Sequence, residues 1–110
     1  MDTPGLDVES VTGMVGGGAQ VVVFTTGLGT PTGNPIAPVI KITGNARTAQ
    51  TMADNIDLDV SGVLDDARIV RARRPIGCST RCSRCRSGRP TAAERLGHRE
   101  FAIHRRNPTI

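Results

Sequence analysis

Aromatic residues are nearly absent from this chain of 110 residues, which has no tryptophan, no tyrosine and only two phenylalanines, Phe24 and Phe101. A buried core must therefore be assembled from Val, Ile, Leu, Ala and Met side chains, and we expect it to be thin. The length allows one domain at most, at the small end of the usual range.

Long apolar runs are also missing. No stretch approaches the roughly 20 apolar residues that a membrane-spanning helix needs. The acidic start MDTPGLDVES lacks the basic-then-apolar order of a signal peptide. These features predict a cytoplasmic protein whose three cysteines are reduced.

Positive and negative charges are divided sharply along the chain, although the net charge is only +4. Residues 1–67 hold Lys41 and Arg47 against eight acids, a balance of −6. Residues 68–110 hold twelve arginines against Glu94 and Glu100, a balance of +10. Phosphate contacts by such a basic block would favour nucleic acid. The block has no aromatic side chain in its densest part, so bases have nothing to stack on, and we do not expect a nucleic-acid partner.

Helical spacing of apolar residues over 6–15 predicts an N-terminal helix capped by Asp7, with Ser10 and Thr12 facing solvent. The glycines at 16–18 follow this helix. Phosphate-binding loops place their glycines before a helix, so we interpret these three as its stop signal.

The following segments alternate between strand and helix patterns. Residues 20–26 form a nearly continuous apolar run, typical of a strand covered on both faces. We expect further strands at 38–43 and 56–63, with a short helix at 45–55 between them. This order predicts a small layered α/β sheet with a parallel component.

The loop at residues 25–37 is a candidate binding site, because α/β sheets hold polar ligands at strand ends. Glycines let the backbone approach a ligand, and threonine hydroxyls and amides form neutral hydrogen bonds. The loop has no acid, base, histidine or cysteine, so it could hold a carboxylate or hydroxyl but could not move a proton. The residues that could bind substrate are Thr25, Thr26, Gly27, Gly29, Thr30, Gly33 and Asn34. The alternative is that the loop is only a tight connection.

Two charged residues outside the loop are further substrate-binding candidates. Lys41 lies within the second strand and either extends to solvent or reaches a ligand as a cation. His98 stands beside Arg99 and Glu100 and could contact substrate or act as a base. A tail tethered by Arg and Glu pairs is the alternative interpretation of that group.

Three collinear stretches carry a family resemblance: MDTPGLDVESVTGMV at 1–15, FTTGLGTPTGNPIAPVIKITGN at 24–45 and LGHREFAIHR at 96–105. Together they resemble the C-terminal domain of the altronate/galactarate dehydratase family, which includes the large subunit of (2R)-sulfolactate sulfo-lyase. The resemblance implies a Rossmann-like domain, with residues 1–67 as its α/β core and 88–110 as a helical turn and tail.

The resemblance also implies a chemistry. Family members eliminate water, or in one branch sulfite, from hydroxy-carboxylic acids with the help of a divalent metal, often Fe²⁺. They are several times longer than this chain. We therefore expect an N-terminal region, in the same or a separate chain, to bind the metal and to carry most catalytic groups. No turnover is expected from this polypeptide alone.

The function that we expect is that of a fragment of a hydro-lyase that dehydrates sugar acids such as altronate or galactarate. Two alternatives stay open. One is a fragment of a (2R)-sulfolactate sulfo-lyase large subunit, and the other is a non-catalytic remnant.

The three cysteines have the spacing C-x3-C-x2-C and are Cys78, Cys82 and Cys85. Thiolates so spaced could hold an iron–sulfur cluster, as in radical S-adenosylmethionine enzymes. Such enzymes need a large barrel, for which this chain has no room. A zinc site would need a fourth ligand, for which His98 and His104 are the candidates. Cysteine spacing alone, without a protein scaffold that would surround the metal, is weak support for a metal site. We therefore expect no metal at these cysteines.

The segment at residues 68–87 does not resemble the family, whose members place an amphipathic helix there. Another reading frame of GC-rich codons for this segment yields Leu and Val at helical intervals. We therefore hypothesise that residues 68–87 are translated out of frame or are disordered. The coding DNA tests this: without a compensating pair of insertions and deletions, the hypothesis fails.

Overall fold

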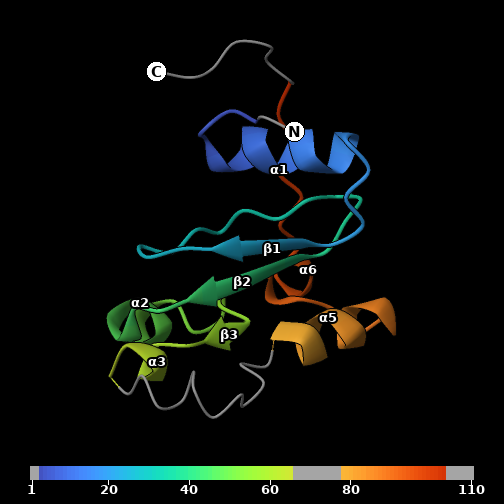
Figure 1. Cartoon of the computed structure of the whole chain (residues 1–110). Coiled ribbons are helices and arrows are strands. Elements are labelled where there is room, and N and C mark those ends of the chain that lie inside the picture. Colours follow the sequence, from blue (N-terminus) through green and yellow to red (C-terminus); the bar gives the residue numbers. More distant parts are fainter. Residues whose placement is uncertain (1–2, 66–77, 104–110) are drawn as a thin grey trace.

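The computed structural model describes residues 3–65 and 78–103, and Figure 1 shows how their helices and strands are arranged. The elements, in chain order, are α1 (Asp7–Gly16), β1 (Val22–Thr25), β2 (Val39–Thr43), α2 (Ala46–Thr51), β3 (Leu58–Asp59), α3 (Gly62–Asp65), α5 (Cys78–Arg86) and α6 (Ala92–Arg95). The first half of the segment hypothesised to be out of frame, residues 68–77, lies outside the described residues, as does His104.

The three strands form one sheet in the order β1-β2-β3, and both pairs are parallel. Val22 of β1 pairs with Val39 of β2, and Ile42 of β2 pairs with Leu58 of β3. The predicted α/β fold with a parallel component is confirmed. In a parallel sheet the carboxyl ends of all strands lie at the same edge, and this edge positions the candidate site.

The strands differ in burial. All five residues of β2, the central strand, are buried. In the edge strand β1, Val23 is 44% exposed. The prediction that residues 20–26 are covered on both faces is therefore wrong for β1. A continuous apolar run does not distinguish a central strand from an edge strand, because the distinction depends on what packs against it.

The core lies between α1 and the sheet, where Val11, Val22 and Val39 pack together and Phe24 lies against them. Figure 1 shows α1 lying across one face of the strands. Neither phenylalanine is fully buried. The core is thus as thin as the composition predicts.

The ends of α1 depart in part from the prediction. Leu6 occupies the N-cap position without a side-chain hydrogen bond, so Asp7 begins the helix rather than capping it. The helix ends at Gly16, as predicted, and Gly18 adopts a φ of 99° after it. Thr12, expected on the solvent side, is buried because the C-terminal tail covers it: its hydroxyl oxygen accepts the Ala102 N–H at 3.1 Å.

Two short helices begin with side-chain caps that their sequences specify. Asn45 precedes α2, and its side chain accepts the Arg47 N–H at 3.0 Å. Thr91 and Glu94 form a reciprocal capping box at α6, where the Thr91 N–H reaches a Glu94 carboxylate oxygen at 2.7 Å. Within the described residues, no helix has the length and apolar character needed to cross a membrane.

Helix α5 lies where no regular element was predicted. Its sequence, CSTRCSRCR, lacks an apolar period but contains neither glycine nor proline, and arginine is a good helix former. The helix contacts the sheet region through Arg81, whose guanidinium donates to Asp57 at 2.6 Å. A single long-range ion pair of this kind leaves no signature in the local sequence.

Candidate functional site

A groove of about 400 Å³ opens at the carboxyl edge of the parallel sheet. It is lined by residues at or just after the ends of the three strands: Thr25, Thr26, Gly27, Ile42, Gly44, Asn45 and Val60. Three of the predicted substrate-binding residues, Thr25, Thr26 and Gly27, thus come together here. Sequence reasoning missed the contributions of Ile42, Gly44, Asn45 and Val60. These residues lie near the ends of β2 and β3, and parallel strands end at the same edge of a sheet.

Hydrogen bonds fix the backbone of this groove. The Gly27 carbonyl accepts from the Thr48 hydroxyl at 2.6 Å and from the Asn45 side-chain amide at 3.0 Å. The Thr26 hydroxyl oxygen accepts the Gly29 N–H at 2.9 Å. The loop is therefore held in place before any ligand arrives, which reduces the entropy lost on binding.

The chemistry of the groove is limited to neutral hydrogen bonding. Among residues 3–65 and 78–103, its lining contains hydroxyls, backbone amides and one side-chain amide, but no acid, histidine or cysteine. Such a surface can orient a carboxylate or hydroxyl group. It cannot remove or supply a proton.

The second half of the loop folds away from this groove. Gly29 adopts a φ of 89° and lies against Met52 and Thr48, where a Cβ would overlap the Met52 sulfur. Thr30 is 6% exposed, and its hydroxyl lies 2.9 Å from that of Thr32. These two candidate residues support the loop rather than line the groove.

Gly33, Asn34 and His98 form a separate group beside the C-terminal tail. The Gly33 N–H donates to a Glu100 carboxylate oxygen at 2.7 Å, and a Cβ on Gly33 would overlap the backbone of His98. Asn34 and His98 both line a pocket of about 370 Å³ that shares no residue with the groove. The buried Nδ1 of His98 has no hydrogen-bond partner among the described residues. The candidates that line a cavity therefore occupy two places, not one.

Lys41 does not extend to solvent. The residue is fully buried, and its ammonium donates to the Thr30 carbonyl at 3.1 Å. Burial lowers the pKa of Lys41, and the negative charges of Asp57 and Glu100 oppose this shift. Of the two roles weighed from the sequence, extension to solvent is wrong. The ammonium instead ties the loop to the central strand.

The titration of Lys41 predicts how stability changes with pH. Because its pKa is lower in the folded chain than the ordinary value of 10.5, the unfolded state binds more protons between the two values. The stability contributed at this site therefore rises with pH through that window. We expect the free energy of unfolding to rise, relative to a Lys41→Met variant, as the pH approaches 10.5. Urea unfolding of both proteins at several pH values measures this difference.

The composition of the chain makes the pH dependence of this difference attributable mainly to Lys41. The chain has no second lysine and no tyrosine, so few other groups titrate in the same range. The three cysteines are common to both proteins, and their titration cancels in the difference. A difference that is flat or falls with increasing pH would show that burial does not disfavour the ammonium.

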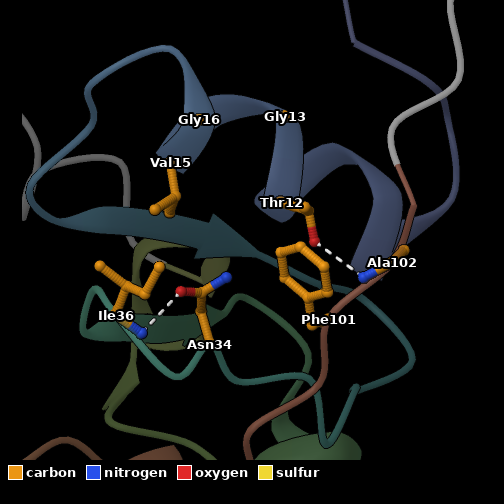
Figure 2. Close-up of a pocket in the computed structure, with 8 residues that line it drawn as sticks. All are labelled: Thr12, Gly13, Val15, Gly16, Asn34, Ile36, Phe101 and Ala102. Carbon is orange, nitrogen blue, oxygen red and sulfur yellow. Dashed lines mark hydrogen bonds between the residues drawn. The ribbon is translucent and has the colours of Figure 1, made fainter.

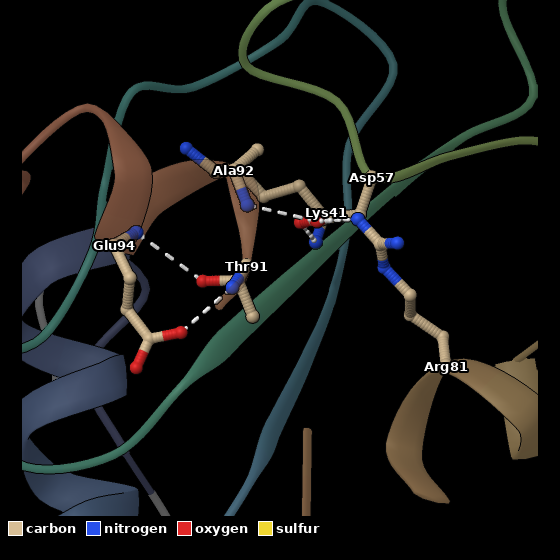
Figure 3. A network of polar contacts seen from close by, with 6 residues as sticks. All are labelled: Lys41, Asp57, Arg81, Thr91, Ala92 and Glu94. Atoms are coloured by element: carbon tan, nitrogen blue, oxygen red, sulfur yellow. Dashed lines mark hydrogen bonds and ion pairs between the residues drawn. The ribbon is translucent and has the colours of Figure 1, made fainter. Parts of the chain in front are cut away.

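Asp57 joins three segments, a role that was missed by the sequence analysis, which assigned it only to the strand expected at 56–63. Its side chain is fully buried and accepts from Arg81, from the Ala92 N–H at 2.9 Å and from the Lys41 N–H at 3.0 Å. Figure 3 shows these groups converging on the carboxylate. Asp57 thus connects β2, α5 and α6.

Two of the three cysteines, Cys82 and Cys85, have described side chains on α5. Cys82 and Cys85 are free thiols, and burial raises the pKa of Cys85 above its ordinary value of 9.0. Within residues 3–65 and 78–103, no group of three or more His, Cys, Asp or Glu side chains could hold a metal ion. The described residues therefore do not fit the divalent metal that the family resemblance implies.

Comparison with protein families decides the identity of the domain. The family model for the C-terminal domain of D-galactarate/altronate dehydratases matches residues 1–109. The chain belongs to this family. The matched range includes residues 68–87, for which no resemblance was expected from the sequence.

Two curated relatives share the dehydratase C-terminal domain. The chain is 42% identical to a (2R)-sulfolactate sulfo-lyase subunit beta of Chromohalobacter salexigens, over 96% of the chain and 27% of that protein. It is 27% identical to an altronate dehydratase of Escherichia coli, over 100% of the chain and 22% of that protein. The chain thus spans about a quarter of the length of these relatives. No solved structure matches it.

Proposed function

We propose that this chain supplies one wall of the active site of a lyase that eliminates water or sulfite from a hydroxy-carboxylic acid. The observation that carries the proposal is the groove at the carboxyl edge of the sheet, in a domain that belongs to the dehydratase family. Its threonine hydroxyls and backbone amides suit a carboxylate or polyol, and its position is where α/β sheets hold polar ligands.

Both eliminations share one course. A base takes the proton from the carbon next to the carboxylate, the leaving group departs from the following carbon, and the resulting enol becomes a 2-oxo acid. Water leaves a sugar acid, and sulfite leaves sulfolactate. The described lining of the groove contains no base, so its part in this proposal is to position the substrate.

Proton transfer and metal binding are assigned, in this proposal, to the rest of the enzyme. A divalent metal, Fe²⁺ in the first instance, would stabilise the charge that develops on the enolate. The partner that this chain requires is the N-terminal region of the lyase, in the same or a separate polypeptide.

Sulfolactate and the sugar acids remain two candidate substrates. The higher identity to the sulfo-lyase subunit, 42% against 27%, favours testing sulfolactate first. Altronate and galactarate form the second candidate class. Sulfite release separates the two, because both reactions give a 2-oxo acid but only one gives sulfite.

A domain replacement tests the proposal. This chain is substituted for the matched region of the Chromohalobacter sulfo-lyase subunit, and sulfite and 2-oxo acid are measured with (2R)-sulfolactate, altronate and galactarate in the presence of ferrous iron. We expect turnover of one substrate class. In the active protein, Thr25→Val should raise KM about tenfold, equivalent to ~1.4 kcal/mol, because a hydroxyl that lines the groove is lost.

The matched control is Thr51→Val, which removes a hydroxyl that donates to the Arg47 carbonyl on the exposed surface of α2. KM should not change in this variant. A folded replacement that turns over none of these acids would instead support the non-catalytic remnant. Equal KM values for Thr25→Val and Thr51→Val would show that the groove is not part of the active site.

A further inference from the structure

A second pocket, of about 450 Å³, lies between α1 and the C-terminal tail (Figure 2). The residues that shape it are Thr12 and Val15 of α1, Asn34 and Ile36 of the loop, and Phe101 and Ala102 of the tail. Two of its apolar side chains stand largely in solvent: Ile36 is 78% exposed and Phe101 is 65% exposed. The pocket shares no residue with the groove at the strand ends.

The side-chain oxygens of Thr12 and Asn34, which face this pocket, are engaged in hydrogen bonds within the domain. The Thr12 hydroxyl oxygen accepts the Ala102 N–H, and the Asn34 side-chain oxygen accepts the Ile36 N–H at 2.9 Å and the Ala37 N–H at 3.2 Å. Figure 2 shows the Thr12 and Ile36 bonds lying within the pocket wall. The surface therefore presents mainly carbon. Such a lining suits apolar side chains and not an anionic hydroxy acid.

The exposure of Phe101 is costly for a chain with so few large apolar residues. It is one of only two phenylalanines, and burying such a side chain contributes about 1.5–3 kcal/mol. Exposed aromatic side chains beside a concave apolar surface are characteristic of the centres of protein interfaces. Phe101 is thus a large apolar side chain that is not packed into the core of the domain.

We propose that this pocket, with Ile36 and Phe101 at its rim, is the surface on which the remaining part of the lyase docks. The inference rests on the proposed function, because that function requires a partner carrying the base and the metal. In the curated relatives, about three quarters of the polypeptide lies outside the matched region, which the family description places at the C-terminus. A polypeptide of that size offers apolar side chains enough to fill the pocket.

The course of the chain favours the remaining enzyme over a second copy of this domain. The Thr3 hydroxyl lies 2.9 Å from that of Ser10, so the beginning of the described chain runs along α1. A polypeptide preceding the matched region, as in the longer relatives, therefore joins this domain on the helix that forms the pocket. The two sites share no residue, so a segment that fills this pocket does not occupy the groove at the strand ends.

Titration calorimetry tests the docking surface. The full chain is titrated with a probe polypeptide, the Chromohalobacter sulfo-lyase subunit lacking its matched region. We expect a one-to-one complex, and Ile36→Ser and Phe101→Ser should each weaken its affinity about tenfold. Leu28→Ser is the matched control, because Leu28 is 90% exposed and lies outside this pocket. Its affinity for the probe should equal that of the unaltered chain.

Each other outcome counts against the proposal. No complex, or equal affinities for Phe101→Ser and Leu28→Ser, overturns it. Self-association that Phe101→Ser abolishes overturns it in favour of a second copy. The altered side chains are exposed, so urea midpoints should be unchanged and folding cannot account for lost binding.

The binding and turnover experiments fail separately. If Phe101→Ser weakens the complex but no elimination is catalysed, the docking surface is supported and the proposed function is contradicted. The opposite result is an active domain replacement together with binding that Phe101→Ser does not weaken. That result supports the proposed function and rules out the docking surface.

Discussion

Replacing Asp57 with alanine is expected to lower the free energy of unfolding by about 3–5 kcal/mol, which is the usual cost of removing one partner from a buried charged network. The carboxylate is fully buried and accepts from Arg81, the Ala92 N–H and the Lys41 N–H (Figure 3). Its loss leaves two buried amides without acceptors. It also removes one of the two negative charges that oppose the burial of the Lys41 ammonium.

Urea unfolding measures the loss, and two further variants separate its causes. Asp57→Asn keeps the shape and an acceptor but removes the charge, so its stability should lie between that of Asp57→Ala and the unaltered chain. Asp54→Ala is the matched control, because Asp54 is exposed on the segment after α2. Equal losses for Asp54→Ala and Asp57→Ala would show that the network contributes little.

Arg81 requires its own variant, because it lies in the segment hypothesised to be out of frame. Its side chain is 20% exposed, and Arg81→Met leaves the fully buried Asp57 carboxylate without its ion-pair partner, so the loss should be about 1–3 kcal/mol. The two amide donors to Asp57 would persist in this variant. A loss as large as that of Asp57→Ala would mark Arg81 as an integral partner and weigh against the frame hypothesis.

Local patterns predicted the elements of this fold but not their surroundings. The apolar runs located β1 and β2, Asn45 was placed at the start of α2, and the helical turn expected within residues 88–110 is α6. The burial of Lys41 and Asp57 was missed. Both side chains are enclosed by segments far away in the sequence, including the tail and α6, and a short window of sequence does not contain that information.

The division of the candidate site has a geometric cause. β1 and β2 are adjacent and parallel, so the connecting residues 26–38 must return from the carboxyl edge of the sheet to its amino edge. Only the first residues of the loop, Thr25 to Gly27, can remain at the carboxyl edge. The later residues, from Gly29 to Asn34, pack against α2 and the tail on the way back. The composition indicated the whole loop as a binding site, whereas the sheet topology leaves only its first residues at the carboxyl edge.

Replacing Gly33 with alanine is expected to detach the C-terminal tail from the loop. The added Cβ would lie 2.8 Å from the Cβ of His98 and would overlap its carbonyl oxygen, so one of the two backbones must move. That movement breaks the hydrogen bond from the Gly33 N–H to Glu100, and with it the alignment that lets Ala102 donate to Thr12. Overpacking of this kind costs about 1–3 kcal/mol.

Trypsin cleavage after Arg99 reports the detachment directly, because this residue is exposed and immediately precedes Glu100, the first of the two hydrogen-bonded residues of the tail. We expect faster cleavage there in Gly33→Ala, together with a lower urea midpoint. Gly27→Ala provides the control, since nothing lies within 4 Å of a Cβ at that position. Its cleavage rate and midpoint should match those of the unaltered chain. Unchanged cleavage in Gly33→Ala would mean that the tail does not depend on the close approach of Gly33 and His98.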